Sequence, residues 1–206
     1  MIRIKDEAII LSVAKFQESF LLVRCLTKDH GMMAGLIRRS KKNNEIVPGN
    51  YVSLHWSARL REQLGYFKFE VLQNIFALLI TIRHKVILLN SATSILPILI
   101  NEREQQLETF GLLRSFIFNI SKSLSIDYNE IVKDFFLYVT FETEVLNRSG
   151  YGKVKHSVSK YIETADLLRR LKISENFMQS HFLSSKKIKI PMSRKFLVDY
   201  LSNLQD

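Results

Sequence analysis

The sequence predicts an α+β protein in which a five-stranded β-barrel precedes an all-α helical domain. Up to about residue 73, short apolar runs with a two-residue period alternate with turn signals, as in consecutive strands. Beyond that point the apolar residues follow the period of helices. The chain is 47% hydrophobic, which is enough to build a core in each part. We therefore expect residues 1–75 to form the barrel and residues 76–206 the helical domain.

Five strands are expected in the first part. They cover residues 8–14, 20–27, 32–39 and 51–60, followed by a run that turns Phe67, Phe69 and Val71 inward. Segments 29–31 and 48–50 are expected to be turns, because glycine tolerates positive φ and aspartate hydrogen-bonds its own backbone. Short strands at this spacing favour a barrel, since closure removes the exposed edges of an open sheet.

The helices of the second part are expected to end at recognisable signals. The first runs over residues 75–89 and continues helically through residues 90–100 to an end near Pro97. Asp127 is a candidate N-cap, with Glu130 three residues later to complete a capping box, for a helix that stops at Gly150. The remaining helices are expected over residues 105–124, 165–171, 175–182 and 193–204.

The net charge of +10 indicates a polyanionic partner, nucleic acid first and an anionic membrane surface second. Solvated lysines without such a partner are the alternative. The first residues lack the apolar core of a signal peptide, and polar residues interrupt the apolar stretch 76–100. These features favour a cytoplasmic protein without a membrane span.

Residues with catalytic or metal-binding potential are scattered. The single cysteine, Cys25, excludes an internal disulfide and a multi-cysteine metal site, and its strand-like surroundings favour a small buried hydrophobe over a reactive thiol. There is no glycine-rich phosphate loop, and the five histidines are dispersed. Glu142 and Glu144 lie two residues apart on a helix and face different ways. We therefore expect no enzyme and no cofactor.

The better functional signal is the basic, aromatic-bearing barrel. Single-strand-binding barrels combine cations for phosphates with aromatic rings on which bases stack. In five-stranded barrels of this type, strands two and three and the loops between strands one–two and four–five form the usual binding face. Mapped onto this chain, that face gathers Lys15, Phe16, Arg24, Arg38, Arg39, Lys41, Lys42, Tyr51, Arg59, Arg61 and Tyr66. A merely solvated hairpin at residues 38–42 is the alternative.

The aromatic residues of the fourth strand are sorted by alternation. Its inward face holds Val52, Leu54, Trp56, Ala58 and Leu60, and its outward face holds Tyr51, Ser53, His55, Ser57 and Arg59. Trp56 would suit base stacking, but this register places it in the core, as it does Phe67 and Phe69 in the next strand. Tyr51 is the better stacking candidate because it lies on the polar face.

Several segments, in order and spacing, resemble the bacterial RecO family of recombination mediators. They are DEAIILS at residues 6–12 with Glu18-Ser19, LTKDHG at 26–31, GLIR at 35–38, Pro48-Gly49-Asn50, WSARLREQLG at 56–65, Phe141-Glu142 through Leu146, and SGYG at 149–152. The resemblance implies an N-terminal oligonucleotide-binding (OB) barrel and a C-terminal helical domain. It also implies a role in DNA repair: binding single- and double-stranded DNA, annealing strands, and helping to load the recombinase onto strands coated by single-stranded-DNA-binding protein (SSB). RecR is the partner it implies.

One departure from the family concerns zinc. Many members place a four-cysteine zinc module after the Gly-Tyr-Gly region, whereas this chain has no cysteine there. We therefore expect a compact form without structural zinc.

The helical domain is predicted to hold the acidic, apolar-ended C-terminal tail of SSB. Such a tail needs an apolar pocket rimmed by cations, and two segments offer both kinds of residue. The candidates are Arg114, Phe116, Lys122, Arg169 and Arg170. The alternative is that the apolar residues form the core and the cations are solvated.

Two other functions stay open. An RNA-binding barrel associated with translation fits the same composition, because such barrels also serve RNA. A nuclease is a weaker hypothesis, since no carboxylate cluster supports it. The leading expectation is a DNA-annealing mediator in the bacterial cytoplasm, associated with the nucleoid.

Overall fold

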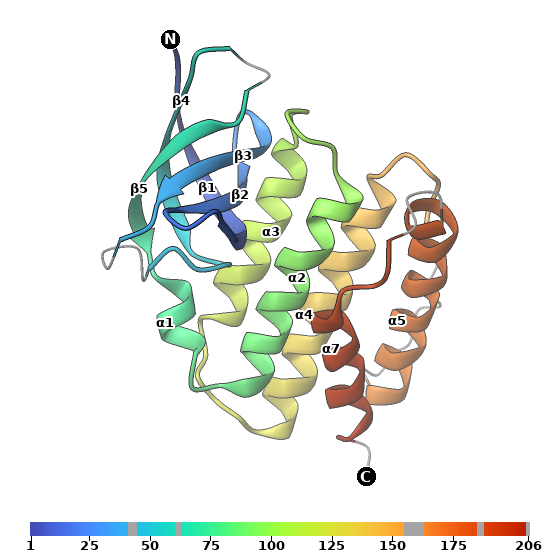
Figure 1. Cartoon of the computed structure of the whole chain (residues 1–206). Coiled ribbons are helices and arrows are strands. Elements are labelled where there is room, and N and C mark those ends of the chain that lie inside the picture. The colour runs from blue at the N-terminus through green and yellow to red at the C-terminus, as the bar shows by residue number, and fades with distance from the viewer. Residues whose placement is uncertain (41–44, 61–62, 155–162, 185–187, 205–206) are drawn as a thin grey trace. The chain divides into compact units, whose positions relative to one another are not determined.

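The computed structural model describes residues 1–40, 45–60, 63–154, 163–184 and 188–204. The chain divides into two compact units (Figure 1). One comprises Met1–Leu78 with Ile100–Gly111, and the other comprises Leu79–Leu99 with Leu112–Asp206. Residues 100–111, which the sequence assigned to the helical domain, thus cluster with the strands.

The first unit is a closed five-stranded barrel in the order β1-β2-β3-β5-β4. The strands are β1 (Ile2–Phe16), β2 (Phe20–Thr27), β3 (Gly31–Arg38), β4 (Tyr51–Ala58) and β5 (Gly65–Gln73). The predicted fold class is confirmed, and the bounds of β2 are those expected. Strand β1 begins six residues before its predicted start, because its first residues alternate isoleucine with charge rather than forming an apolar run.

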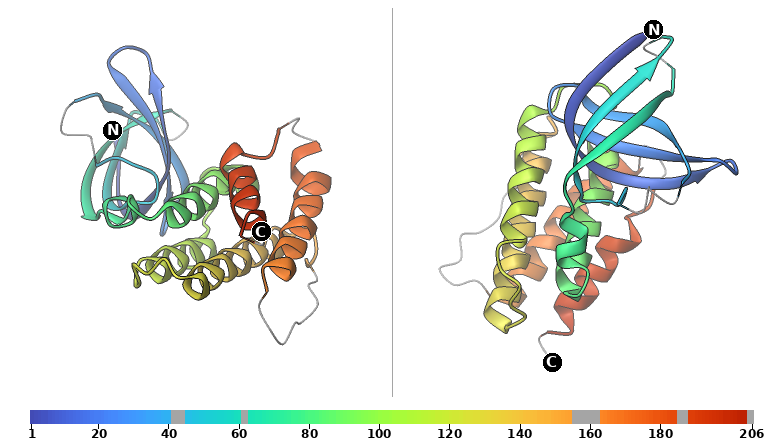
Figure 2. Two further views of the ribbon diagram at one scale, coloured as in Figure 1. Left: turned by 90° about the horizontal axis from the view of Figure 1, so that it is seen from below. Right: turned by 90° about the vertical axis from the view of Figure 1, so that its left-hand side faces the viewer.

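The length of β1 lets it join both sides of the barrel. Its first half pairs with β4 from Ile2 to Ile9, and its second half pairs with β2 from Ala8 to Phe16. A register shift between Ile10 and Ser12 lies within the pairing with β2, just after the pairing with β4 ends, and such bulges bend a strand. The two further views in Figure 2 show the curvature of the strands.

The barrel closes where β3 and β5 run parallel, at Gly35 opposite Gly65. A Cβ atom on Gly35 would lie 2.7 Å from the Phe67 ring. On Gly65 it would lie 2.4 Å from Trp56 Nε1 and 2.6 Å from the Ser57 carbonyl oxygen. Only residues without a side chain allow the two strands to approach this closely.

The barrel core contains most of the residues that alternation assigned to it. Trp56 and Phe67 are buried as predicted, and Phe69 packs against this core. Cys25 is fully buried and its burial raises the pKa of the thiol, so the prediction of a small buried hydrophobe is confirmed. Leu60 was wrongly assigned inward: it lies beyond the end of β4 and is 57% exposed.

The turn at 29–31 is fixed by Asp6 of β1. Its carboxylate accepts hydrogen bonds from the backbone N–H of Asp29 at 3.0 Å and contacts His30 Nδ1 at 2.7 Å. Gly31 follows with φ of +70°, as expected for a glycine turn. The turn therefore depends on a side chain from another strand as well as on its own residues.

The helices continue the chain from residue 75. They are α1 (Ile75–Leu79), α2 (Arg83–Leu99), α3 (Leu107–Ile120), α4 (Tyr128–Asn147), α5 (Thr164–Met178), the π-helical turn η2 (Gln179–Leu183) and α7 (Met192–Ser202). No helix in the described ranges is long and apolar enough to cross a membrane.

Three helix predictions need correction. The helix expected over residues 75–89 is broken at residues 80–82, a β-branched run with low helix propensity. Helix α2 passes through Pro97 and ends two residues later, at Leu99. The helices expected over 165–171 and 175–182 are not separate: α5 runs unbroken from Thr164 to Met178, with buried residues at helical spacing across the expected gap, and η2 follows it directly.

The N-cap of α4 is confirmed. The Asp127 side chain accepts a hydrogen bond from the Glu130 N–H at 2.9 Å. A capping box would also have the Glu130 side chain accept a hydrogen bond from the Asp127 N–H. Here that N–H donates to Ser125 Oγ at 3.2 Å instead, and the Glu130 carboxylate pairs with Lys133.

Candidate nucleic-acid interface

An exposed aromatic residue, Tyr66, stands at the start of β5. It is 54% exposed, and it pairs with Leu36 across the closure of the barrel and with Ser57 of β4. Its ring lies 6.0 Å from the ring of Phe20 on β2, centroid to centroid. An exposed ring with a second ring beside it offers a surface on which a base can stack.

Cations lie in the segments next to this aromatic pair. Phe20 lies opposite Arg38 in the register of β2 and β3, and the Arg39 N–H donates to the Ser19 carbonyl at 2.8 Å. These pairings hold the β1–β2 loop against the end of β3. The structure thereby brings together, at one end of the barrel, five residues predicted from the sequence: Lys15, Phe16, Arg38, Arg39 and Tyr66.

Arg59 joins the group from the loop between β4 and β5. A hollow of about 820 Å³ beside this loop is lined by both Arg59 and Tyr66. The side chain of Arg59 is exposed. This end of the barrel therefore offers a ring and cations on both sides of it, which is the combination that single-strand-binding barrels use.

Arg24 does not reach this end of the barrel. It pairs with Ala34 on β3, four residues along β2 from Phe20. Its guanidinium lies 3.6 Å from the Glu102 carboxylate. The segment that contains Glu102 runs beside β3, and there the Arg103 N–H donates to the Met32 carbonyl at 2.9 Å. A neighbouring carboxylate makes Arg24 a weaker phosphate ligand than the sequence suggested.

Tyr51 is a second correction. It is 8% exposed and its hydroxyl donates to the Glu7 carboxylate, so its ring offers no face to a base. The physical reason is that the outer face of the sheet is covered at this position: Ile9, which lies opposite Tyr51, is 1% exposed, and neither residue belongs to the barrel core. The other predicted residues, Lys41, Lys42 and Arg61, lie outside the described residues.

The sequence did not predict four further cationic or titratable side chains as part of a binding surface. Arg3 and Lys5 of β1, His55 of β4 and Lys68 of β5 are exposed on the outer face of the barrel. They line a hollow of about 580 Å³. The only signal in the sequence was the alternation of charge with isoleucine in residues 2–5, because the grouping depends on the pairing of strands 50 residues apart.

The predicted partner-binding residues of the helices take different places. Phe116 is a correction: it is buried, with its ring stacked 5.1 Å from that of Phe141, and it belongs to the core. Arg114 lies over the Phe118 ring at 5.3 Å, and Lys122 donates to Asn119 at 2.8 Å.

Arg169 and Arg170 both pair with Asp166 on their own helix. Partial burial alone would raise the pKa of Asp166, but hydrogen bonds from the two arginines outweigh it and hold that pKa below the usual range. Both cations are thus engaged in a local network.

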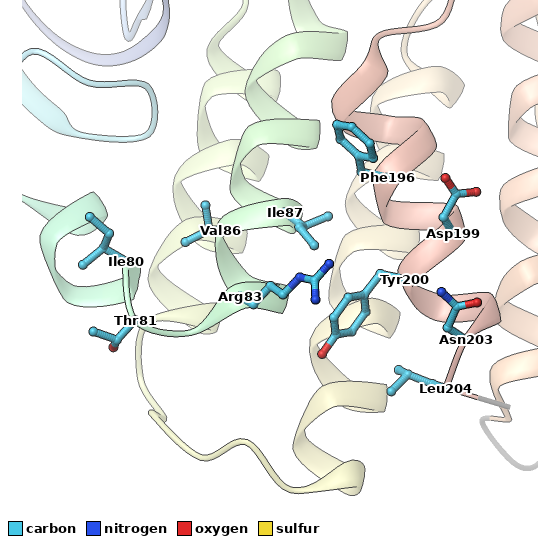
Figure 3. Close-up of a pocket in the computed structure, with 10 residues that line it drawn as sticks. All are labelled: Ile80, Thr81, Arg83, Val86, Ile87, Phe196, Asp199, Tyr200, Asn203 and Leu204. Carbon is cyan, nitrogen blue, oxygen red and sulfur yellow. The ribbon is translucent and has the colours of Figure 1, made fainter. Parts of the chain in front are cut away.

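A groove in the second unit offers a different apolar surface (Figure 3). It holds about 670 Å³ between the start of α2 and helix α7. The Arg83 guanidinium lies 5.7 Å from the centre of the Tyr200 ring, while Phe196 is 57% exposed at the rim. The groove is lined by Ile80, Thr81, Arg83, Val86, Ile87, Phe196, Asp199, Tyr200, Asn203 and Leu204.

Within the described ranges, no three histidine, cysteine, aspartate or glutamate side chains gather in a group that could hold a metal ion. Residues 155–162, which follow the Gly-Tyr-Gly region, are outside those ranges. The absence of structural zinc therefore stays a prediction.

Known proteins with similar sequences decide the family. Residues 1–75 match the family model for the N-terminal domain of recombination protein O. The DNA repair protein RecO of Rickettsia akari is 31% identical over 150 residues, and that of Rickettsia typhi is 32% identical over 150 residues. Each match covers 72% of this chain. The chain belongs to the RecO family.

The matched region spans 60% of the length of each of these two RecO proteins. The residues that match the RecO N-terminal domain form the barrel, so the barrel is an OB fold, as the resemblance implied. The group around Tyr66 lies at the loops between strands one–two and four–five, where OB folds bind their ligands.

Proposed function

We propose that this chain is a DNA repair and recombination mediator that binds single- and double-stranded DNA and anneals complementary strands. It helps to load the recombinase onto SSB-coated strands without a catalytic step, in the bacterial cytoplasm at the nucleoid. The observation that carries the proposal is Tyr66 beside Phe20, with Arg38, Arg39 and Arg59 around them at one end of an OB fold. The names of the relatives support it.

The physical basis is that aromatic rings bind the bases while cations bind the phosphates. Base stacking on an aromatic side chain contributes about 1–3 kcal/mol per base and tolerates any sequence. Cations at the same place neutralise phosphates and make the affinity depend on salt. A mediator must act on strands of any sequence, and neither interaction reads base edges.

Tyr66→Ala should weaken binding of a single-stranded DNA oligonucleotide about 5- to 150-fold, the range that corresponds to one lost stacking interaction. Fluorescence anisotropy at fixed salt measures this change. Tyr128→Ala is the matched control, because Tyr128 is 53% exposed on a helix remote in sequence from the barrel. Equal affinities for the two variants would contradict the assignment of Tyr66.

An RNA oligonucleotide of the same sequence tests the alternative of an RNA-binding protein. Annealing of complementary DNA strands without ATP, together with DNA binding at least as tight as RNA binding, supports the mediator. Clearly tighter binding of RNA, without annealing, supports the alternative.

RecR and the C-terminal tail of SSB are the proposed protein partners. For the tail, the groove beside α7 fits better than the predicted residues, because it combines an exposed apolar lining with Arg83. An acidic peptide with an apolar end would place its end on Phe196 and its charge near the guanidinium. Asp199, on the same lining, opposes an acidic ligand.

Calorimetry with the tail peptide should therefore give binding that weakens with salt, is lost in Arg83→Glu and tightens in Asp199→Asn. Arg169→Glu changes the charge equally on another helix and should leave the affinity near that of the unchanged protein. Absence of binding by the unchanged protein at low salt would exclude this docking site.

A further inference from the structure

A row of basic side chains crosses three strands on the outer face of the barrel. In the register of β1 and β4, Lys5 lies opposite His55, and in the register of β4 and β5, His55 lies opposite Lys68. Residues in this relation have Cβ atoms about 4.5–5.5 Å apart. Arg3 extends the row by one position on the same face, opposite Ser57. We call Arg3, Lys5, His55 and Lys68 the cross-strand row.

The cross-strand row gathers three cations on one face of the barrel. Lys5 and Lys68 flank His55, Arg3 lies two residues from Lys5 on the same face, and neighbouring like charges repel one another. All four side chains are exposed, and none has a hydrogen-bond or ion-pair partner in the part of the chain that the structure describes. A polyanion lying across the strands would remove this repulsion.

Acidic residues border the row on one side only. Two positions further along the same strands, Glu7 lies opposite Ser53 and Ser53 lies opposite Glu70. On the other side, Ser57 lies opposite Tyr66, which belongs to the interface described above. A polyanion is therefore repelled from the edge at Glu7 and Glu70, and it is guided across the strands toward Tyr66.

The dimensions suit a nucleic-acid strand. Neighbouring strands are about 4.8 Å apart, so Lys5 and Lys68 lie roughly 10 Å apart across β4. A strand of a duplex carries one charge per about 3.4 Å of axis, so this span faces about three phosphates. Flexible lysine and arginine side chains can reach them without a fixed geometry.

We infer that the cross-strand row is a second phosphate-binding track, which carries the nucleic-acid backbone past Tyr66 onto the outer face of β1, β4 and β5. The inference rests on the proposed nucleic-acid binding and adds a surface to it. Tyr66 then lies between two cationic tracks: the row on one side and Arg38 with Arg39 on the other.

The test compares salt dependence in the full chain. Arg3→Gln, Lys5→Gln and Lys68→Gln are combined, and binding of a labelled single-stranded DNA oligonucleotide is measured between 50 and 200 mM salt by anisotropy, a range in which phosphate contacts are resolved. The plot of log K against log salt has a negative slope, and the loss of three contacts should make that slope shallower by about two. The control combines Lys28→Gln, Lys133→Gln and Lys172→Gln, exposed lysines outside the row, and removes the same net charge.

A gain of affinity provides the second measurement. Glu70→Gln removes an acid at the border of the row and should tighten binding, an effect that a damaged barrel would not produce. A slope in the row variant equal to that of the control, with no tightening in Glu70→Gln, overturns the track while DNA binding through Tyr66 stands. If the unchanged protein binds no DNA at 50 mM salt, the proposed function and the track both fail.

Discussion

Arg194→Met is expected to destabilise the protein by about 3–5 kcal/mol, because it leaves a buried carboxylate without its partner. Arg194, near the start of α7, and Glu142 of α4 are both fully buried. The guanidinium donates to Glu142 through Nε at 2.8 Å and through Nη2 at 2.9 Å. Burial alone lowers the pKa of Arg194, but the charge and hydrogen bonds of Glu142 raise it above its usual value, so this cation stays charged.

The same guanidinium connects a third helix. It donates to the Leu171 carbonyl at 2.8 Å and to the Glu175 carboxylate at 3.1 Å, both on α5. Tyr138 adds a hydrogen bond to Glu142 at 2.8 Å. Burial first, and the charge of Glu142 second, raise the pKa of Tyr138, so it remains a neutral donor. Because its one proton goes to Glu142, the Ser91 hydroxyl must donate to Tyr138.

Urea denaturation measures the change in the free energy of unfolding. Arg169→Met is the control, since that arginine is half exposed in a pair with Asp166 and its loss should cost less than about 1 kcal/mol. Adding Glu142→Gln to Arg194→Met should recover part of the loss, because it removes the unpaired charge. Similar stabilities for Arg194→Met and the control would show that the pair does not hold α7 in place.

Local patterns in the sequence were sufficient for much of the barrel. Alternation found β2 to the residue and placed Trp56 and Phe67 in the core. Asp127 was recognised as an N-cap because its role depends on residues three positions away. These features depend on neighbours in the chain, which a single sequence displays.

Features that depend on pairing between distant strands were not predictable. The approach of Gly35 to Gly65 closes the barrel, but each glycine by itself signals only a turn or a bulge. Tyr51 keeps the expected side of its strand, but that side is covered at this position, where Ile9 lies opposite it and is 1% exposed. The cross-strand row has members on β1, β4 and β5, so only the register reveals that they are neighbours.

The buried charge pairs of the helices could not be predicted from the sequence either. Lys85 lies in a stretch that is apolar nearly all round, and this was the available signal that a partner must exist. Its partner, Asp134, is 49 positions away on α4, and the sequence offers no means to connect them. The separate faces predicted for Glu142 and Glu144 are confirmed: the first is fully buried, and the second pairs with Arg148 near the surface.

The pair of Lys85 and Asp134 yields the second large effect. Both side chains are at most 1% exposed, with Lys85 Nζ 2.6 Å from Asp134 Oδ2. The ammonium also donates to the Ile120 carbonyl at the end of α3, at 2.8 Å, which satisfies one of the free carbonyls of that helix end. His84 Nε2 lies 3.0 Å from the same carboxylate oxygen, while Oδ1 has no hydrogen-bond partner among the described atoms.

Lys85→Met should therefore cost about 3–5 kcal/mol in the free energy of unfolding, because Asp134 and the Ile120 carbonyl both lose their buried donor. Lys133→Met is the matched control: it removes a lysine beside Asp134 in sequence, but one that is 62% exposed and pairs with Glu130, so its cost should stay below about 1 kcal/mol. Asp134→Asn in the Lys85→Met background should restore part of the stability, since the remaining group is neutral. A double variant less stable than Lys85→Met would mean that the hydrogen bond to Ile120, rather than the buried charge pair, is the larger contribution.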